Sequence, residues 1–141
     1  MGTSKRSQAR DLVLQGLYAT EIGETEESDV FEDIIEGAEL GDNALEFAHN
    51  LFDQVRQERA WADKIISELA HNWKLERIAI IDQIVLRMAM TEMKVVLDTP
   101  IKVVLNEAIE LAKRYSTAES SRFVNGILDS FVKNHVEGAK K

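Results

Sequence analysis

Residues 78–93 of this chain read IAIIDQIVLRMAMTEM, and this stretch decides the fold class. Apolar side chains occupy almost every side of a helix drawn through it, with Asp82, Arg87 and Glu92 as the charged exceptions. A helix that is apolar on nearly all sides is typical of the centre of a bundle, where it has neighbours on several faces. The pattern therefore predicts a central helix from Glu76 to about Leu97.

The same helical periodicity of apolar residues runs through the rest of the chain, which contains one proline. This pattern predicts an all-α protein. No repeat or linker divides the sequence, so we expect a single domain over residues 1–141. Ser4 is a good N-cap, so we expect a first helix to begin after it and to end near Gly23. Ser28 is expected to cap a short second helix that ends near Gly37, and Asp42 to open a longer third one. Further helices are expected over Trp61 to Trp73, from Pro100 to about Tyr115, and after a capping box of Ser116 and Glu119.

Composition restricts the class of protein. Cysteine is absent, which excludes disulfides and thiolate metal sites. The basic N-terminus is not followed by the apolar core of a signal peptide, and no stretch reaches the roughly 18 uncharged apolar residues of a membrane span. We therefore expect a cytoplasmic protein that does not contact a membrane.

Charge is distributed unevenly along the chain, which has a net charge of −8. Residues 1–10 carry three bases and no acid, residues 21–46 carry eleven acids and no base, and residues 101–141 carry seven bases against five acids. The acidic run is typical of a solvated face. The two basic ends could form one patch for nucleic acid on an otherwise acidic body.

The sequence contains none of the motifs that mark the common catalytic sites. The three histidines, at positions 49, 71 and 135, lack the i, i+4 spacing of a zinc pair on a helix. Phosphate-binding loops, nucleophile elbows and calcium loops are also missing. We expect no enzyme and no cofactor.

The opening helix carries cations where helix stability does not explain them. Arg6 and Arg10 lie one turn apart and point to the same side. Positive charges are slightly unfavourable near a helix N-terminus, so phosphate binding is one explanation for them. An ordinary basic terminus that improves solubility is the other.

A second segment, residues 113–123, surrounds a hydroxyl-rich turn with basic and aromatic side chains. Lys113, Arg114 and Tyr115 precede this turn, and Arg122 and Phe123 follow it. Single-stranded RNA needs this combination, because bases stack on rings while cations meet phosphates. Taken alone, Phe123 is more often a core residue than a stacking platform.

Asn125 and Gly126 lie inside the last helical pattern. Glycine there costs about 1 kcal/mol relative to alanine. Close packing of another helix against Gly126 would explain its presence.

Three groups of residues resemble the NusB family of bacterial transcription antitermination factors. The most specific group is NEAIELAK at residues 106–113 together with FVNGILD at residues 123–129. The first part of the chain resembles the start of the family sequence at Arg6, Ala9, Arg10, Gln15, Leu17 and Tyr18. Its central part resembles the middle of the family sequence over residues 84–93 and at Pro100, Lys102 and Val103. The resemblance spans nearly the whole chain and is weakest over residues 21–60.

This resemblance implies a fold of about seven helices in two packed helical bundles. It also implies binding of the single-stranded boxA element of ribosomal-RNA leader transcripts, as a heterodimer with the ribosomal protein NusE, within an RNA polymerase antitermination complex. Asp82 and its neighbours on the central helix become candidates for the NusE face. By matching position, the RNA-binding residues are Lys5, Arg6, Arg10, Gln15, Tyr18, Glu119, Arg122 and Phe123.

Alternative readings remain open from the sequence. One is a non-catalytic domain related to the N-terminal region of ribosomal-RNA cytosine methyltransferases. Another is a helical scaffold without a nucleic-acid role, which the acidic charge favours. The free protein could be a monomer or a homodimer.

Overall fold

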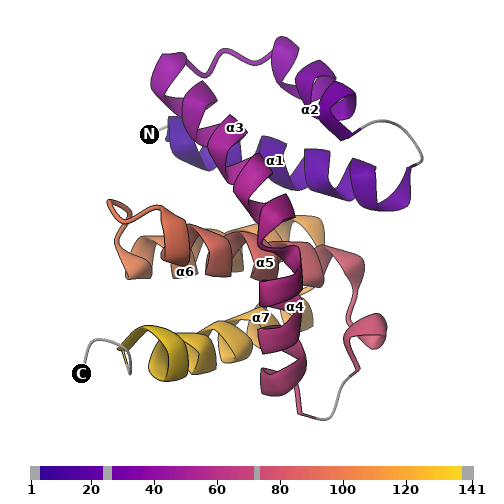
Figure 1. Cartoon of the computed structure of the whole chain (residues 1–141), viewed down its shortest axis with the longest axis vertical. Coiled ribbons are helices and arrows are strands. Elements are labelled where there is room, and N and C mark those ends of the chain that lie inside the picture. The colour runs from indigo at the N-terminus through magenta and orange to yellow at the C-terminus, as the bar shows by residue number, and fades with distance from the viewer. Residues whose placement is uncertain (1–3, 24–26, 72–73, 138–141) are drawn as a thin grey trace. The chain divides into compact units, whose positions relative to one another are not determined.

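The computed structural model describes residues 4–23, 27–71 and 74–137, and every regular element within these ranges is a helix. The all-α prediction is confirmed. A short 3₁₀ turn, η1 (Leu75–Arg77), precedes α5, and a π-helical segment, η2 (Val132–Glu137), follows α7. The seven α-helices of the described residues, labelled in Figure 1, are α1 (Lys5–Ile22), α2 (Glu27–Glu36), α3 (Asp42–Gln57), α4 (Arg59–Leu69), α5 (Ile80–Val95), α6 (Ile101–Tyr115) and α7 (Ala118–Phe131).

The chain forms two compact units, Met1–Arg56 and Gln57–Lys141, which we call unit 1 and unit 2. In unit 1 the rings of Phe31 from α2 and Phe52 from α3 stack with their centroids 4.2 Å apart. Gly16 of α1 lies against this pair, because a Cβ added to it would be 2.7 Å from the Phe31 ring. The absence of a side chain at Gly16 therefore lets α1 approach the two rings closely.

In unit 2 the central position belongs to α5, which contacts α4, α6 and α7. All eleven side chains from Asp82 to Glu92 are buried, polar ones included. The prediction of a central helix from the apolar pattern is confirmed. Burial of charged residues in such a helix requires polar partners, because an unpaired buried charge is costly.

The expected start of this central helix at Glu76 is wrong. Residues 75–77 form η1, Ile78 and Ala79 are extended, and α5 begins only at Ile80. The Gln83 side chain stabilises this break in the helix, because it donates to the carbonyl group of Leu75 in η1 and to that of the extended residue Ile78. Side-chain hydrogen bonds of this kind offer the backbone an alternative to continued helix.

Other predicted boundaries agree with the structure to within a few residues. Ser4 caps α1, Gly23 follows its end, and α3 begins at Asp42. Helix α2 includes Ser28 rather than being capped by it, and Pro100 precedes α6 as its N-cap. The expected inner-face residue Trp73 lies outside the described residues.

The predicted capping box of Ser116 and Glu119 is displaced by one residue. Thr117 is the N-cap of α7, and its hydroxyl accepts a hydrogen bond from the Ser120 amide at 3.0 Å. The Ser116 hydroxyl is instead 2.8 Å from the Ser120 hydroxyl. Three neighbouring hydroxyls therefore meet at the start of α7.

Across the described ranges, no helix combines the length and the apolar character needed to cross a membrane.

Candidate nucleic-acid interface

The start of α1 presents one exposed cation. The Ser4 hydroxyl accepts a hydrogen bond from the Ser7 amide at 3.1 Å, which fixes the first turn. Lys5 follows directly and is exposed, and its ammonium donates to the Glu39 carbonyl oxygen at 2.7 Å. An ammonium has three donors, so Lys5 can keep this contact and still meet a phosphate.

Arg6 and Arg10 share one side of α1, as their spacing predicts, but that side faces Phe47 of α3. The guanidinium carbons lie 4.6 Å and 5.1 Å from the centre of the Phe47 ring. Arg6 is half-buried, whereas Arg10 is only 3% exposed. The structure thus places Arg10 in the interior, which does not support the predicted surface contact between this guanidinium and RNA.

Gln15 and Tyr18 lie one turn apart on another side of α1. Gln15 is exposed, and Tyr18 is 37% exposed although it is a large aromatic residue. A ring on the surface next to an amide can stack on a base while the amide forms a hydrogen bond with it. The structure therefore brings these two predicted residues together.

The start of α7 carries the predicted residues of unit 2. Glu119 and Arg122 are exposed, and Phe123 is half-buried. Arg122 and Phe123 follow Glu119 by three and four residues, so both lie next to Glu119 on the helix surface. Gly126 continues the same face and is also exposed.

No close packing explains Gly126, contrary to our expectation. A Cβ added at this position would meet nothing within 4 Å. Alanine would therefore fit there without a clash.

A pocket of about 310 Å³ opens beside α7 within unit 2. Its size lies at the lower end of the range seen for small-molecule sites. Two segments form its lining: residues 77–79 with Asp82, and the first turns of α7. The second segment contributes the N-cap Thr117 and the α7 residues Glu119, Ser120 and Phe123.

Asp82, the predicted NusE contact, is 5% exposed and lines this pocket. Burial raises the pKa of its carboxyl, and a hydrogen bond from Ser120 opposes that shift in part. Its Oδ1 atom has no hydrogen-bond partner among the described residues. The structure therefore groups Asp82 with Glu119 and Phe123, predicted RNA residues, rather than on an exposed helix face.

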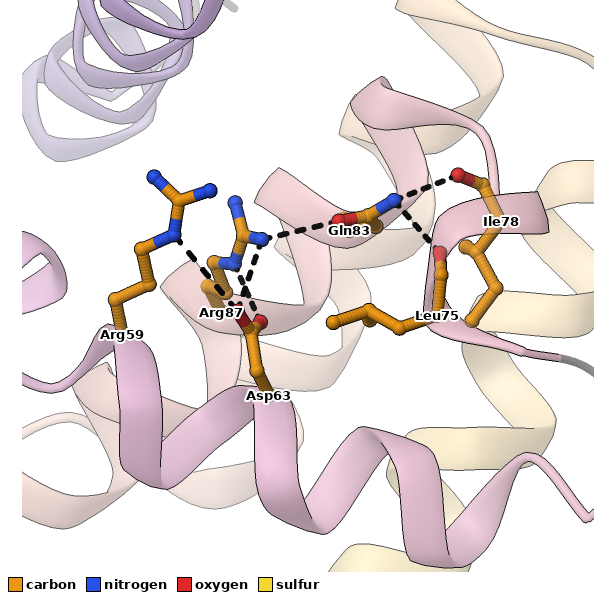
Figure 2. A network of polar contacts seen from close by, with 6 residues as sticks. All are labelled: Arg59, Asp63, Leu75, Ile78, Gln83 and Arg87. Atoms are coloured by element: carbon orange, nitrogen blue, oxygen red, sulfur yellow. Dashed lines mark hydrogen bonds and ion pairs between the residues drawn. The ribbon is translucent and has the colours of Figure 1, made fainter.

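A polar network that the sequence did not predict joins α4 and α5 (Figure 2). Arg87 donates to Asp63 through Nε at 2.7 Å and through a terminal nitrogen at 3.2 Å, and the same terminal nitrogen donates to Gln83 at 3.0 Å. Arg59 lies 3.7 Å from Asp63. The signal that could have revealed this network is the pair of polar residues at positions 83 and 87, one turn apart in an apolar helix.

The Gln83 amide connects this network to the segment that lines the pocket. Its nitrogen donates to the carbonyl oxygens of Leu75 at 2.9 Å and Ile78 at 2.7 Å. Figure 2 shows Gln83 lying between Arg87 and these two carbonyl groups. The segment before α5 is thus held by a side chain of α5.

Comparison with known proteins identifies relatives along nearly the whole chain. The model of the NusB family matches residues 7–133. A transcription antitermination protein NusB from Elusimicrobium minutum is 40% identical over 140 residues, covering 94% of this chain and 96% of the relative. The corresponding protein of Dictyoglomus turgidum is 40% identical over 138 residues, covering 98% of this chain and 91% of that relative.

Solved structures agree with this result. The NusB structure of T. maritima has a TM-score of 0.85 at 34% identity and covers 99% of this chain and 98% of its own. A chain from a complex of the antitermination factors NusB and NusE with double-stranded RNA has a TM-score of 0.84 at 23% identity, covering 93% of this chain and 98% of that one. The chain therefore belongs to the NusB family.

Proposed function

We propose that this protein acts in transcription antitermination by binding single-stranded boxA RNA of ribosomal-RNA leader transcripts together with NusE. It works in the cytoplasm within an RNA polymerase antitermination complex, and it catalyses no reaction. The curated relatives that match along almost their whole length are transcription antitermination proteins, which favours this function over a methyltransferase-related domain. A chain of the same fold occurs in a complex with NusE and RNA.

The observation that carries the proposal is the surface at the start of α7. Phe123 offers a partly exposed ring beside a pocket, and the exposed Arg122 is its neighbour in sequence. The ring supplies stacking, and the guanidinium supplies a phosphate contact. A scaffold without a nucleic-acid role gives no reason for this combination.

Unit 1 contributes a second set of groups suited to RNA. Lys5 is an exposed cation, Arg6 is a half-buried one, and Gln15 and Tyr18 present an amide and a ring. We assign these four residues to RNA binding. We assign Arg10 a structural role instead: its guanidinium is buried next to the Phe47 ring and stabilises the packing of α1 against α3.

We assign Asp82 to the RNA pocket, since it lines this pocket with Phe123. The alternative role of Asp82, contact with NusE, predicts a different result. Substitution of Asp82 by asparagine would then weaken NusE binding in the absence of RNA. On our assignment NusE binding without RNA stays unchanged.

Binding of labelled boxA RNA, measured by fluorescence anisotropy with and without NusE, tests the function. We expect the mixture to bind boxA more tightly than a shuffled strand or a duplex of the same sequence. If about four phosphates are neutralised, log affinity falls with log salt at a slope near −3. Equal affinity for boxA and shuffled RNA would reject the proposal.

Sedimentation of the free protein in the same buffer distinguishes a monomer from a homodimer.

A further inference from the structure

One buried side chain, Gln83, joins the backbone hydrogen bonds that hold the segment forming one wall of the pocket in unit 2. Gln83 is 9% exposed, and its amide nitrogen donates to the carbonyl oxygens of Leu75 and Ile78. The pocket residues Arg77, Ile78 and Ala79 lie within or directly after this held segment. The two side-chain hydrogen bonds from Gln83 therefore contribute to the position of the wall, together with the backbone hydrogen bonds from Ile78 N–H to Leu75 and from Gln83 N–H to Ala79.

Gln83 is itself fixed from the other side. Arg87 donates to its amide oxygen at 3.0 Å and to the Asp63 carboxylate at 2.7 Å and 3.2 Å. Because the oxygen is engaged by Arg87, the nitrogen is directed to the two carbonyl groups (Figure 2). A chain of hydrogen bonds thus runs from α4 through α5 to the pocket wall.

The chemistry of the pocket suits a base better than a phosphate. Two carboxylates, Asp82 and Glu119, line it against one cation, Arg77. The unpartnered Oδ1 of Asp82 is an acceptor, which matches the N–H groups on the edge of a base. Phe123 adds an aromatic ring for stacking.

We propose that Gln83 is a positioning residue that sets the pocket wall opposite Phe123 so that one unstacked RNA base enters between them. This inference rests on the proposed function. Gln83 does not touch the RNA, because both ends of its amide are bonded within the protein. Its influence on binding is confined to the one base that occupies the pocket.

The test combines protein variants with boxA strands that each lack one base, measured in the presence of NusE. Gln83→Glu keeps the acceptor for Arg87 but has no N–H for the two carbonyl groups. Gln83→Met removes the same bonds without adding charge. Val104→Ala, which trims a buried residue of α6, is the control for a general loss of stability.

In the wild type we expect one position where loss of the base weakens binding by about 5- to 150-fold, the range for one base stacked on an aromatic ring. In both Gln83 variants the same loss changes affinity by less than about twofold, while the effects at all other positions remain. Val104→Ala keeps the wild-type pattern. A structural role alone would not remove the effect of one particular base.

Two results would overturn this inference and leave the proposed function standing. The first is wild-type binding of boxA with no sensitive position. The second is a Gln83 variant, folded by circular dichroism, that retains the full wild-type pattern or weakens every strand equally. If wild-type protein with NusE does not prefer boxA over shuffled RNA, the proposed function fails and this inference fails with it.

Discussion

The three cations of α1 differ in exposure, and Arg6 is half-buried. Lys5 is exposed, whereas Arg10 is 3% exposed and lies over the Phe47 ring. A desolvated cation above an aromatic ring contributes on the order of 2 kcal/mol. We predict that Arg10→Met lowers the melting temperature and leaves the salt slope of RNA binding unchanged.

Lys5→Ala is the matched variant and should do the opposite. It removes one exposed cation, so the salt slope should become shallower by about 0.7 while the melting temperature changes little. A salt slope that responds to Arg10 and not to Lys5 would show that the buried guanidinium reaches phosphate after all.

Phe123 is the aromatic residue on which the α7 site depends most. Loss of a ring that stacks on a base costs about 1–3 kcal/mol. We predict that Phe123→Ala weakens binding of boxA RNA by this amount in anisotropy titrations, whereas Phe123→Trp retains most of the affinity because it keeps an aromatic face. Equal losses in both variants would indicate that the residue acts through packing.

The protonation of Asp82 makes the stability of the fold depend on pH. Because burial raises the pKa of Asp82, the folded protein holds this proton to a higher pH than the unfolded chain does. Stability therefore falls as pH rises from the unfolded value near 3.9 through the raised folded value. We predict that Asp82→Asn raises the melting temperature at pH 7 and that the difference disappears below about pH 3.9. A lower melting temperature at pH 7 would contradict the direction of this shift.

Among single residues, the sequence predicted the Ser4 cap of α1 but not the environment of Arg10. Ser4 was recognisable as a cap because the capping hydrogen bond is local, from the hydroxyl to the Ser7 amide. The burial of Arg10 was not, since it depends on Phe47, which lies in another helix. Spacing showed that Arg6 and Arg10 share a side and left open what that side faces.

Among the helices, α1 and α7 provide a matched pair of glycines. A Cβ at Gly16 would lie 2.7 Å from the Phe31 ring and 3.2 Å from the Phe52 ring, and both rings are buried. At Gly126 nothing lies within 4 Å. Alanine gains about 1 kcal/mol of helix propensity at either site, but overpacking at Gly16 costs about 1–3 kcal/mol.

We therefore predict opposite effects on stability in urea titrations. Gly126→Ala should stabilise the protein by about 0.5–1 kcal/mol, and Gly16→Ala should destabilise it. If Gly16→Ala stabilised the protein equally, the close approach of α1 to the two rings would be wrong.

For helix α5, the hydrophobic pattern predicted the central position but not the residue at which the helix begins. Its apolar character on all sides correctly predicted a central position. The break before Ile80 was missed because the hydrogen bonds from Gln83 to Leu75 and Ile78 stabilise the extended segment. Hydrophobic periodicity carries no information about which carbonyl groups a side chain will satisfy.

The protein as a whole is acidic and therefore repels RNA. We expect RNA to bind at a limited set of basic, amide and aromatic side chains rather than over the whole surface. The net charge is −8, and eleven acids lie in residues 21–46. The RNA-binding groups that we propose belong to both units, with Gln15 and Tyr18 in unit 1 and Arg122 and Phe123 in unit 2. The family was predictable from ordered motifs such as residues 123–129. The pocket was not, since its lining comes from segments about 40 residues apart.

The central claim, that both units hold the RNA, is tested most directly by one set of anisotropy titrations with boxA RNA and NusE. The variants are Gln15→Ala with Tyr18→Ala in unit 1, Arg122→Ala with Phe123→Ala in unit 2, and the combination of all four. We predict that each pair weakens binding by at least about tenfold and that the combined loss is close to the sum of the two free-energy changes, as expected when two pairs act independently. Wild-type affinity in either pair, with the fold intact, would contradict the account.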